Sequence, residues 1–250
     1  MRLTEVRLRN FRNYETQDFA PAPYMNILIG ENAAGKTNIL ESLFLAALGK
    51  SHRTPRDAEL IRYGEEHASV DLQIETRAGS RSIGVRLSRN GQKKLLIDGK
   101  RLNRSGELMG CLNLVLFAPE DLTLIKSGPG ERRRFMNMAL SQQDPQYYYL
   151  LQVYNAALKQ RNALLKNEEL PSEKEFLPWE EQLAASGSRI RKSRASFCAE
   201  IAFRAGEIQT RLSGERERLT VAYKPDIPLL SEGDPHALME RLAETRRQDM

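Results

Sequence analysis

The sequence predicts an α/β fold: a glycine-rich loop between a strand and a helix, then an antiparallel β meander, then an inserted helical lobe with a short antiparallel hairpin. Three observations support this class. The apolar run 25–30 leads into a glycine-containing segment, and apolar residues then recur at helical spacing up to Gly49. Apolar and polar residues alternate within 69–100. From Glu131 onward the chain has little glycine, proline or β-branched content until the break near residue 167.

The length of 250 residues suits one large domain or one domain with an insertion. We expect a first lobe over 1–126, a helical lobe with a hairpin arm over 127–218, and the start of a return to the first lobe over 219–250. The chain stops inside a helical pattern that has no C-terminal cap or terminator, so we expect a chain truncated at its C-terminus.

Charge and composition set broad limits on the function. A formal net charge of +5 is mild evidence for a polyanionic partner, because Lys and Arg displace counterions from phosphates. Cys111 and Cys198 form no disulfide framework, which favours a reducing compartment. The N-terminus is charged throughout and no uninterrupted apolar run approaches about 18 residues, so we expect a cytoplasmic protein with no membrane segment.

The elements of the first lobe follow from local patterns. Residues 2–11 place apolar side chains among charges, as a half-buried strand does, and 25–30 predicts the strand before the loop. Asn90-Gly91 and Asp98-Gly99 mark the tight turns of the meander. The continuous apolar run within 112–121 predicts a buried strand.

The helical lobe is expected to contain two long helices, over about 145–167 and about 179–213. Most apolar steps in the second helix are sevens, the spacing of a helical hairpin seam, although two ordinary core helices explain the pattern equally well. Residues 218–225 resemble a strand, and 234–250 resemble a capped helix.

Gly30 to Thr37 matches the phosphate-loop pattern G-x-x-x-x-G-K-T in the required context of strand and helix. Gly30 and Gly35 allow backbone angles that turn successive N–H groups toward the β-phosphate. Lys36 reaches the β- and γ-phosphates, the Thr37 hydroxyl ligates Mg²⁺, and the helix N-terminus adds its positive dipole end. The sequence therefore predicts a nucleotide site.

Three features together carry a family resemblance: "LRNFRNYE" before the loop, the loop form G-x-N-x-x-G-K-T-N, and "LFAPEDLTLIKSGPGERRRFMNMAL" after the meander. They resemble the heads of SMC-like ABC ATPases, and in detail the RecF family of bacterial recombination and repair proteins. The resemblance implies a P-loop ABC-type ATPase head that binds ATP and Mg²⁺. The residues it assigns to the nucleotide are Asn10, Phe11, Arg12, Gly30, Glu31, Asn32, Ala33, Ala34, Gly35, Lys36 and Thr37.

In this assignment Lys36 and Thr37 are catalytic and Thr37 is the metal ligand. The alternative for Phe11 is a core residue, and for Arg12 a surface charge. Ala33 stands where such heads commonly have Gly, which leaves less room beside the phosphates.

Further candidates lie outside the loop. Arg53 and Arg56 follow the loop helix and are assigned either to phosphate or DNA or to a solvated loop. The run Ser127 to Arg132 imitates an ABC signature motif, but its position fits a helix start, with Gly130 at the N-terminus and Glu131 in the first turn.

The strand ending in Glu120 and Asp121 imitates a Walker B motif. The resemblance places these acids near Mg²⁺ or the attacking water. If instead they are true Walker B acids, the chain is a small-molecule P-loop kinase or NTPase.

The resemblance also implies partners. Two heads sandwich ATP, the dimer clamps duplex DNA beside a single-stranded gap, and RecR and RecO cooperate with it in loading RecA during recombinational repair, replication restart and the SOS response. The complete protein is expected to be a slow, DNA-stimulated ATPase. The chain as given is expected to bind ATP weakly and to hydrolyse it poorly, because signature and Walker B motifs would follow residue 250.

Two basic clusters are candidates for DNA contact, as phosphate tracks without base readout or as solvated faces. They are Lys93, Lys94, Lys100, Arg101 and Arg104 on the meander, and Arg189, Arg191, Lys192 and Arg194 on the second long helix.

Overall fold

The computed structural model describes residues 1–167, 171–225, 235–246 and 248. The chain divides into two compact units, Met1–Asp121 and Leu122–Met250. The three-part division at residues 126 and 218 stays a prediction.

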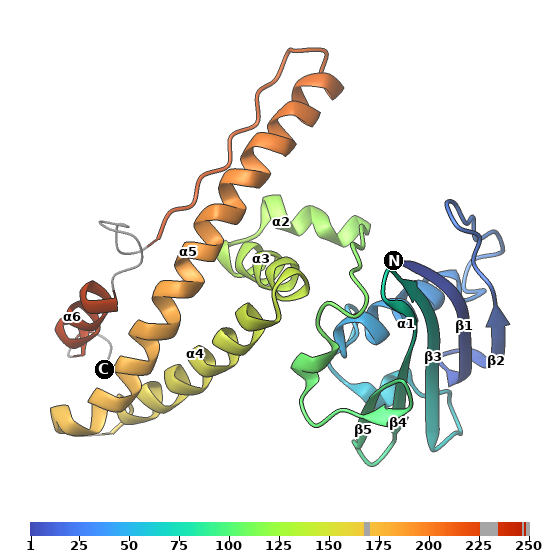
Figure 1. Ribbon diagram of the computed structural model, residues 1–250, viewed down its shortest axis with the longest axis horizontal. Coiled ribbons are helices and arrows are strands. Elements are labelled where there is room, and N and C mark those ends of the chain that lie inside the picture. The colour runs from blue at the N-terminus through green and yellow to red at the C-terminus, as the bar shows by residue number, and fades with distance from the viewer. Residues whose placement is uncertain (168–170, 226–234, 247, 249–250) are drawn as a thin grey trace. The chain divides into compact units, whose positions relative to one another are not determined.

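The first unit is built on a six-stranded antiparallel sheet in the order β2-β1-β3-β4-β5-β6 (Figure 1). Its strands are β1 (Arg2–Phe11), β2 (Tyr14–Phe19), β3 (His67–Thr76), β4 (Gly79–Ser88), β5 (Lys93–Ile97) and β6 (Lys100–Arg101). The predicted first strand and the meander are confirmed. The edge strand β2 was not predicted, because its sequence YETQDF has few apolar residues to mark a buried face.

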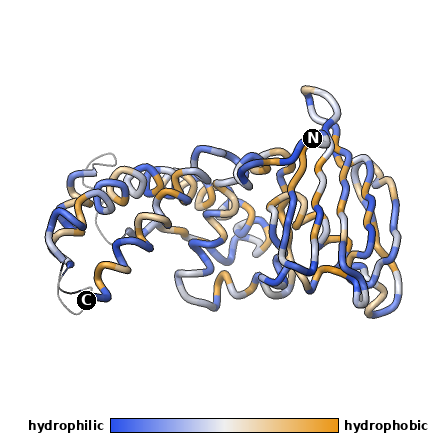
Figure 2. Tube along the Cα trace, turned by 90° about the horizontal axis from the view of Figure 1, so that it is seen from below, coloured by the Kyte–Doolittle hydropathy of each residue, from blue (hydrophilic) through white to orange (hydrophobic). Residues whose placement is uncertain are grey.

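The two faces of this sheet differ in chemistry, as the alternating hydropathy along the strands shows (Figure 2). One face is buried and is contacted by α1 (Lys36–Leu48), whose Phe44 and Leu45 are also buried. The strand residues buried there include Val6, Leu8, Val70, Leu72, Ile83 and Val85. The opposite face carries ion pairs across neighbouring strands, Arg9 with Asp18 and Arg86 with Asp71.

Helix α1 ends as the sequence predicts. Gly49 adopts a left-handed conformation with φ of 69°, and its N–H donates to Leu45 O. The chain then forms the short helix η1 (Asp57–Leu60), and an isolated bridge joins Ile61 to Phe11 at the end of β1. A second short helix, η2 (Ser105–Leu108), follows the sheet.

Two apolar segments of the first unit differ from expectation. Residues 25–30 form no strand, and Ile27 and Ile29 are exposed. The prediction of a buried strand over 112–121 is wrong, because Val115 and Phe117 are exposed and the segment ends in η3 (Pro119–Leu122). A strand needs a neighbour for its backbone groups, and within the described residues neither segment has one.

The second unit is helical. Its elements are α2 (Thr123–Lys126), α3 (Pro129–Gln143), α4 (Pro145–Leu164), α5 (Glu173–Leu212) and α6 (Pro235–Thr245) (Figure 1). Helix α4 packs along α5, so the helical hairpin is confirmed, and α6 packs on α5. Among the residues described here, no helix is both long and apolar enough to cross a membrane.

Helix boundaries in this unit follow capping residues. Helix α5 starts earlier than predicted, because Ser172 and Glu175 form a capping box and the helix continues through Pro178. Helix α3 is capped at Gly128 rather than Gly130, with Pro129 as its first residue. Residues 218–225 form no strand, so that prediction is wrong.

The core of the hairpin mixes apolar and charged groups. Leu140, Tyr147 and Ile190 form an apolar cluster against which Phe197 packs. Farther along, the buried carboxylate of Glu180 pairs with Arg161 at 3.1 Å and with Arg246 at 2.5 Å. This charged cluster joins α4 and α5 to the residues that follow α6.

Candidate functional site

The glycine-rich loop 30–37 lies on the surface at the N-terminus of α1. Residues 31–34 are exposed, whereas Gly35 is buried and forms the N-cap of the helix with φ of 99°. Ala33 also has a left-handed backbone, with φ of 65°. A Cβ is disfavoured in this conformation by about 1–2 kcal/mol.

Lys36 closes the loop onto itself. Its Nζ donates to Gly30 O and to Glu31 O, each at 2.7 Å. The backbone adds bonds from Ala34 N to Glu31 O and from Asn38 N to Gly35 O. The ammonium group is thus held at the loop, and the Lys36 residue remains partly exposed.

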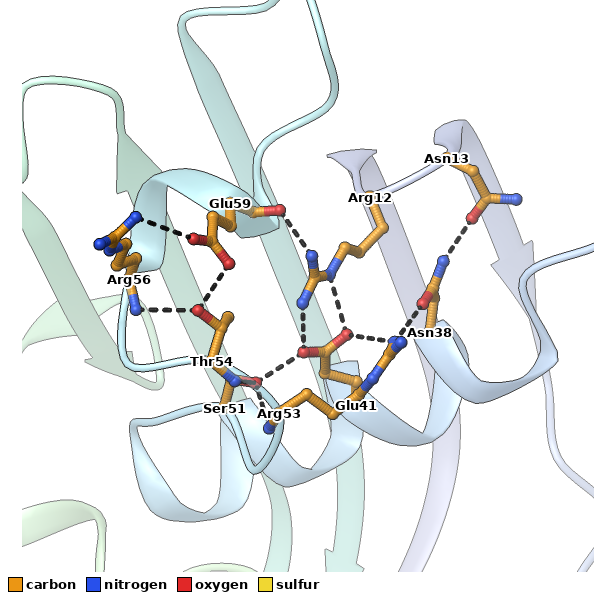
Figure 3. A network of polar contacts seen from close by, with 9 residues as sticks. All are labelled: Arg12, Asn13, Asn38, Glu41, Ser51, Arg53, Thr54, Arg56 and Glu59. Carbon is orange, nitrogen blue, oxygen red and sulfur yellow. Dashed lines mark hydrogen bonds and ion pairs between the residues drawn. The ribbon is translucent and has the colours of Figure 1, made fainter. Parts of the chain in front are cut away.

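A polar network stands behind the loop, centred on Glu41 of α1 (Figure 3). The Glu41 side chain has no exposed surface and accepts hydrogen bonds from Arg12 Nε at 2.9 Å and Nη2 at 2.7 Å. Ser51 Oγ donates to it at 2.6 Å and Arg53 Nη1 at 3.3 Å. Burial alone would raise the pKa of Glu41, but the hydrogen bonds from Arg12 and Ser51 and the positive charges of Arg12 and Arg53 outweigh it and lower that pKa.

The network reaches two arginines predicted as candidates. Arg53 also donates to Asn38 Oδ1 at 3.0 Å, and its side chain is 47 % exposed. Arg56 is 80 % exposed and pairs loosely with Glu59 at 3.7 Å. Of these two, only Arg53 contacts Glu41, whereas Arg56 joins the network through Thr54 and Glu59 (Figure 3).

The three residues predicted before the loop point to different places. Phe11 is fully buried in the core. Arg12 turns to Glu41, and its Nη1 also donates to Glu59 O at 2.8 Å. Asn10 has φ of 48° and donates to Glu65 Oε2. Their roles toward a nucleotide stay predictions.

A pocket of about 400 Å³ lies on the ion-paired face of the sheet. It is lined by Arg9, Asn10, His67, Ala68, Ser69, Arg86, Leu87, Ser88, Asn90, Gln92 and Lys94. No carboxylate is among these lining residues, while Arg9, Arg86 and Lys94 contribute cations. Arg9 and Arg86 are paired with Asp18 and Asp71, so among the described residues Lys94 is the cation of this pocket that forms no ion pair.

Residues of the two predicted basic clusters differ in the contacts they make. Lys93 lies on the α1 side of β5, where its Nζ pairs with Asp57 at 2.7 Å and donates to Gly49 O at 2.9 Å. Lys94 lines the pocket on the other face. On α5, Arg194 donates to Tyr147 and Asn137, which joins three helices of the second unit.

Of the two acidic residues that end the predicted Walker B strand, the structure describes the side chain of one. Asp121 Oδ2 accepts from Ala118 N at 2.7 Å, a local capping bond. The side chain of Glu120 lies outside the described residues. Across the described part of the chain, no three His, Cys, Asp or Glu residues gather as a metal site.

Sequence reasoning missed Asn13, Tyr14, Asn38 and Glu41. The available signal was Glu41, a carboxylate within the apolar periodicity of α1. A charge at such a position is buried only with a partner.

Comparison with known proteins assigns the family. The chain matches the family model described as the RecF/RecN/SMC N terminal domain over residues 2–239. A DNA replication and repair protein RecF from Lachnospira eligens is 38% identical over 254 residues, with 100% of this chain and 68% of the relative covered. The chain belongs to the RecF family. A second RecF, from Alkaliphilus oremlandii, is 37% identical with the same coverage.

Solved RecF structures confirm the fold. The recombination mediator protein RecF in complex with ATP has a TM-score of 0.89 at 30% identity, covering 99% of this chain and 68% of the RecF chain. The structure described as RecF-ATPrS gives a TM-score of 0.90. The predicted class, an ABC-type ATPase head with a helical hairpin, is thus confirmed. The chain spans about two thirds of the length of these relatives.

Proposed function

We propose that this chain binds ATP with Mg²⁺ through Gly30 to Thr37. The observation that carries the proposal is the exposed loop at the N-terminus of α1, with Gly35 at φ of 99° and Lys36 held on the loop. The RecF relative solved with ATP supports the choice of nucleotide.

The residues present fit this ligand. The first N–H groups of a helix have no intrahelical acceptor, and together with the helix dipole they favour a phosphate. Lys36 would move from the carbonyls of Gly30 and Glu31 to the β- and γ-phosphates. The Thr37 hydroxyl, exposed at the first turn of α1, would hold Mg²⁺, which neutralises phosphate charge when bound.

The second part of the proposal is DNA contact through the ion-paired face of the sheet. The pocket on this face is lined by Lys94, and also by Arg9 and Arg86, which pair with Asp18 and Asp71. Phosphate contacts of this kind bind DNA without reading its sequence. We do not propose DNA contact for Lys93 or Arg194, because both make contacts within the protein.

The proposed cellular role is based on the relatives, which are named DNA replication and repair protein RecF. We propose an ATP-dependent homodimer that clamps DNA at a junction of single and double strand and acts with RecR and RecO in loading RecA. Hydrolysis is slow and resets the clamp. A small-molecule kinase is not favoured, since Asp121 serves a local cap and the family is one of DNA repair proteins.

The test is sedimentation of the protein with ATP and Mg²⁺, with and without gapped DNA. Wild type is expected to dimerise with ATP and to carry DNA, whereas Lys36→Met stays monomeric. Lys159→Met, an exposed lysine on α4, is the matched control and is expected to behave as wild type. A protein that stays monomeric and consumes ATP without DNA would support the kinase instead.

A further inference from the structure

The turn between β1 and β2 contacts the phosphate loop directly. Asn13 Nδ2 donates to Ala34 O at 3.3 Å, and the Tyr14 hydroxyl donates to the same oxygen at 3.4 Å. A Cβ added at Gly35 would lie 2.7 Å from the amide atoms of Asn13 and from the Tyr14 oxygen. The two side chains therefore fill the space behind Gly35, and the loop rests against them.

This contact sets the direction of one amide of the loop. The C=O and N–H of a trans peptide point in opposite directions. With Ala34 O held by Asn13 and Tyr14, the Gly35 N–H points away from them. Loops that bind phosphate depend on successive N–H groups that face the same side.

Both amide side chains behind the loop have a defined orientation. A guanidinium only donates hydrogen bonds, so Asn38 must present its oxygen to Arg53 and its NH₂ to Asn13. Asn13 then presents its oxygen to Asn38, at 2.8 Å, and its NH₂ to Ala34. Figure 3 shows this line of contacts from Arg53 through Asn38 to Asn13.

The turn is itself fixed to the body of the unit. Arg12, the residue before Asn13, pairs with the buried Glu41 and donates its backbone N–H to Leu60 O at 2.8 Å. The turn moves away from the loop only if these bonds break. Burial raises the pKa of Tyr14, so its phenol is a neutral donor at physiological pH.

We propose that Asn13 and Tyr14 are positioning residues that hold the Ala34–Gly35 peptide so that the Gly35 N–H faces the β-phosphate of a nucleoside di- or triphosphate. The inference rests on the proposed nucleotide binding. The β1–β2 turn then contributes to nucleotide binding indirectly, because neither Asn13 nor Tyr14 touches the nucleotide.

The test measures ADP affinity in the presence of Mg²⁺ for Tyr14→Phe, Asn13→Ala and the double variant, together with unfolding of each protein without ligand. Each single variant is expected to weaken ADP binding by about threefold, and the double by about tenfold, the range of one and two modest hydrogen bonds. The unliganded melting temperature is expected to stay within about 2 °C of wild type, as for a small change in stability. Tyr24→Phe and Asn155→Ala, both at exposed positions, are matched controls with unchanged affinity.

The outcomes separate the two proposals. Wild type that binds no ADP, or binds it as Lys36→Met does, defeats the proposed function itself. If wild type binds ADP and all three variants bind it equally well, only the positioning role is overturned. A lower melting temperature with unchanged ADP affinity overturns it too, and if Asn13→Ala does not fold, Tyr14→Phe decides.

Discussion

The guanidinium of Arg12 donates two hydrogen bonds, of 2.9 and 2.7 Å, to the carboxylate of Glu41, a side chain with no exposed surface. The pair joins the β1–β2 turn to the helix that follows the phosphate loop. Arg53 and Ser51 complete the surroundings of the carboxylate, so this one buried charge fixes three segments of the chain (Figure 3).

Replacing Glu41 with Gln is expected to lower the free energy of unfolding by about 3 kcal/mol, because Arg12 is left without its counter-charge. The measurement is chemical denaturation at neutral pH. Glu66→Gln, at an exposed position, is the matched control and is expected to change stability by less than about 0.5 kcal/mol. Equal effects of the two substitutions would contradict the assigned role of the pair.

The same pair predicts a pH dependence. The pKa of Glu41 in the folded protein lies below its ordinary value of 4.5. The unfolded chain therefore binds this proton first as pH falls, and the stabilisation is fully present above the ordinary value and is lost as pH falls through the lowered pKa. Wild type is expected to lose stability below about pH 4.5 more steeply than Glu41→Gln, as urea unfolding at several pH values would show.

Ala33→Gly is expected to stabilise the protein by about 0.5–1 kcal/mol, because relief of the left-handed strain exceeds the entropy that Gly adds to the unfolded chain. Thermal unfolding gives the measurement. Ala34→Gly is the control: its φ is not positive, so the same change should destabilise. If Ala33→Gly is less stable than wild type, Ala33 is unstrained.

Lys93 and Lys94 are expected to respond differently to substitution. Lys94→Ala should weaken DNA binding and reduce the salt dependence by about one counterion, because it lines the pocket on the ion-paired face. Lys93→Ala should leave DNA binding unchanged and lower stability by about 1 kcal/mol, since it loses Asp57 and Gly49 O. The reverse pattern in salt titrations would place the DNA on the other face.

Arg246→Ala is expected to release α6 from the hairpin. Its guanidinium pairs with the buried Glu180 and lies 5.3 Å above the Phe176 ring, so its loss should cost about 3 kcal/mol. Hydrogen exchange of 235–245 should accelerate. Arg241→Ala loses an exposed pair with Glu244, its one ion pair among the described residues, and should leave that exchange near wild type. Unchanged exchange in Arg246→Ala would mean that other contacts hold α6.

Local patterns were reliable where both partners of an interaction lie close in sequence. The meander, the end of α1 at Gly49 and the helical hairpin are of this kind, because turns, caps and helical periodicity act within a few residues. The apolar runs 25–30 and 112–121 show the limit. Apolar character marks a segment suited to burial, but a strand forms only beside another strand, and the described residues supply none.

The candidate site shows the same difference between local motifs and contacts that are distant in sequence. The motif from Gly30 to Thr37 was readable, because each of its residue types follows from the geometry of phosphate binding. For its support, only Glu41 gave a signal, as a charge within an apolar periodicity. The partners of Glu41 and the role of Asn13 depend on which segments the fold brings together.

The phosphate-loop motif, the family resemblance and the order of sheet and hairpin could be identified from the sequence, because they depend on short-range spacing. Only the three-dimensional arrangement shows which charged side chains form ion pairs within the protein. The sequence assigned Arg12 to the nucleotide or to the surface and Lys93 to DNA or to a solvated face. In the structure Arg12 is held by a buried carboxylate and Lys93 by Asp57. Pairing of charges far apart in the chain depends on which segments the fold brings together, and no local pattern encodes that.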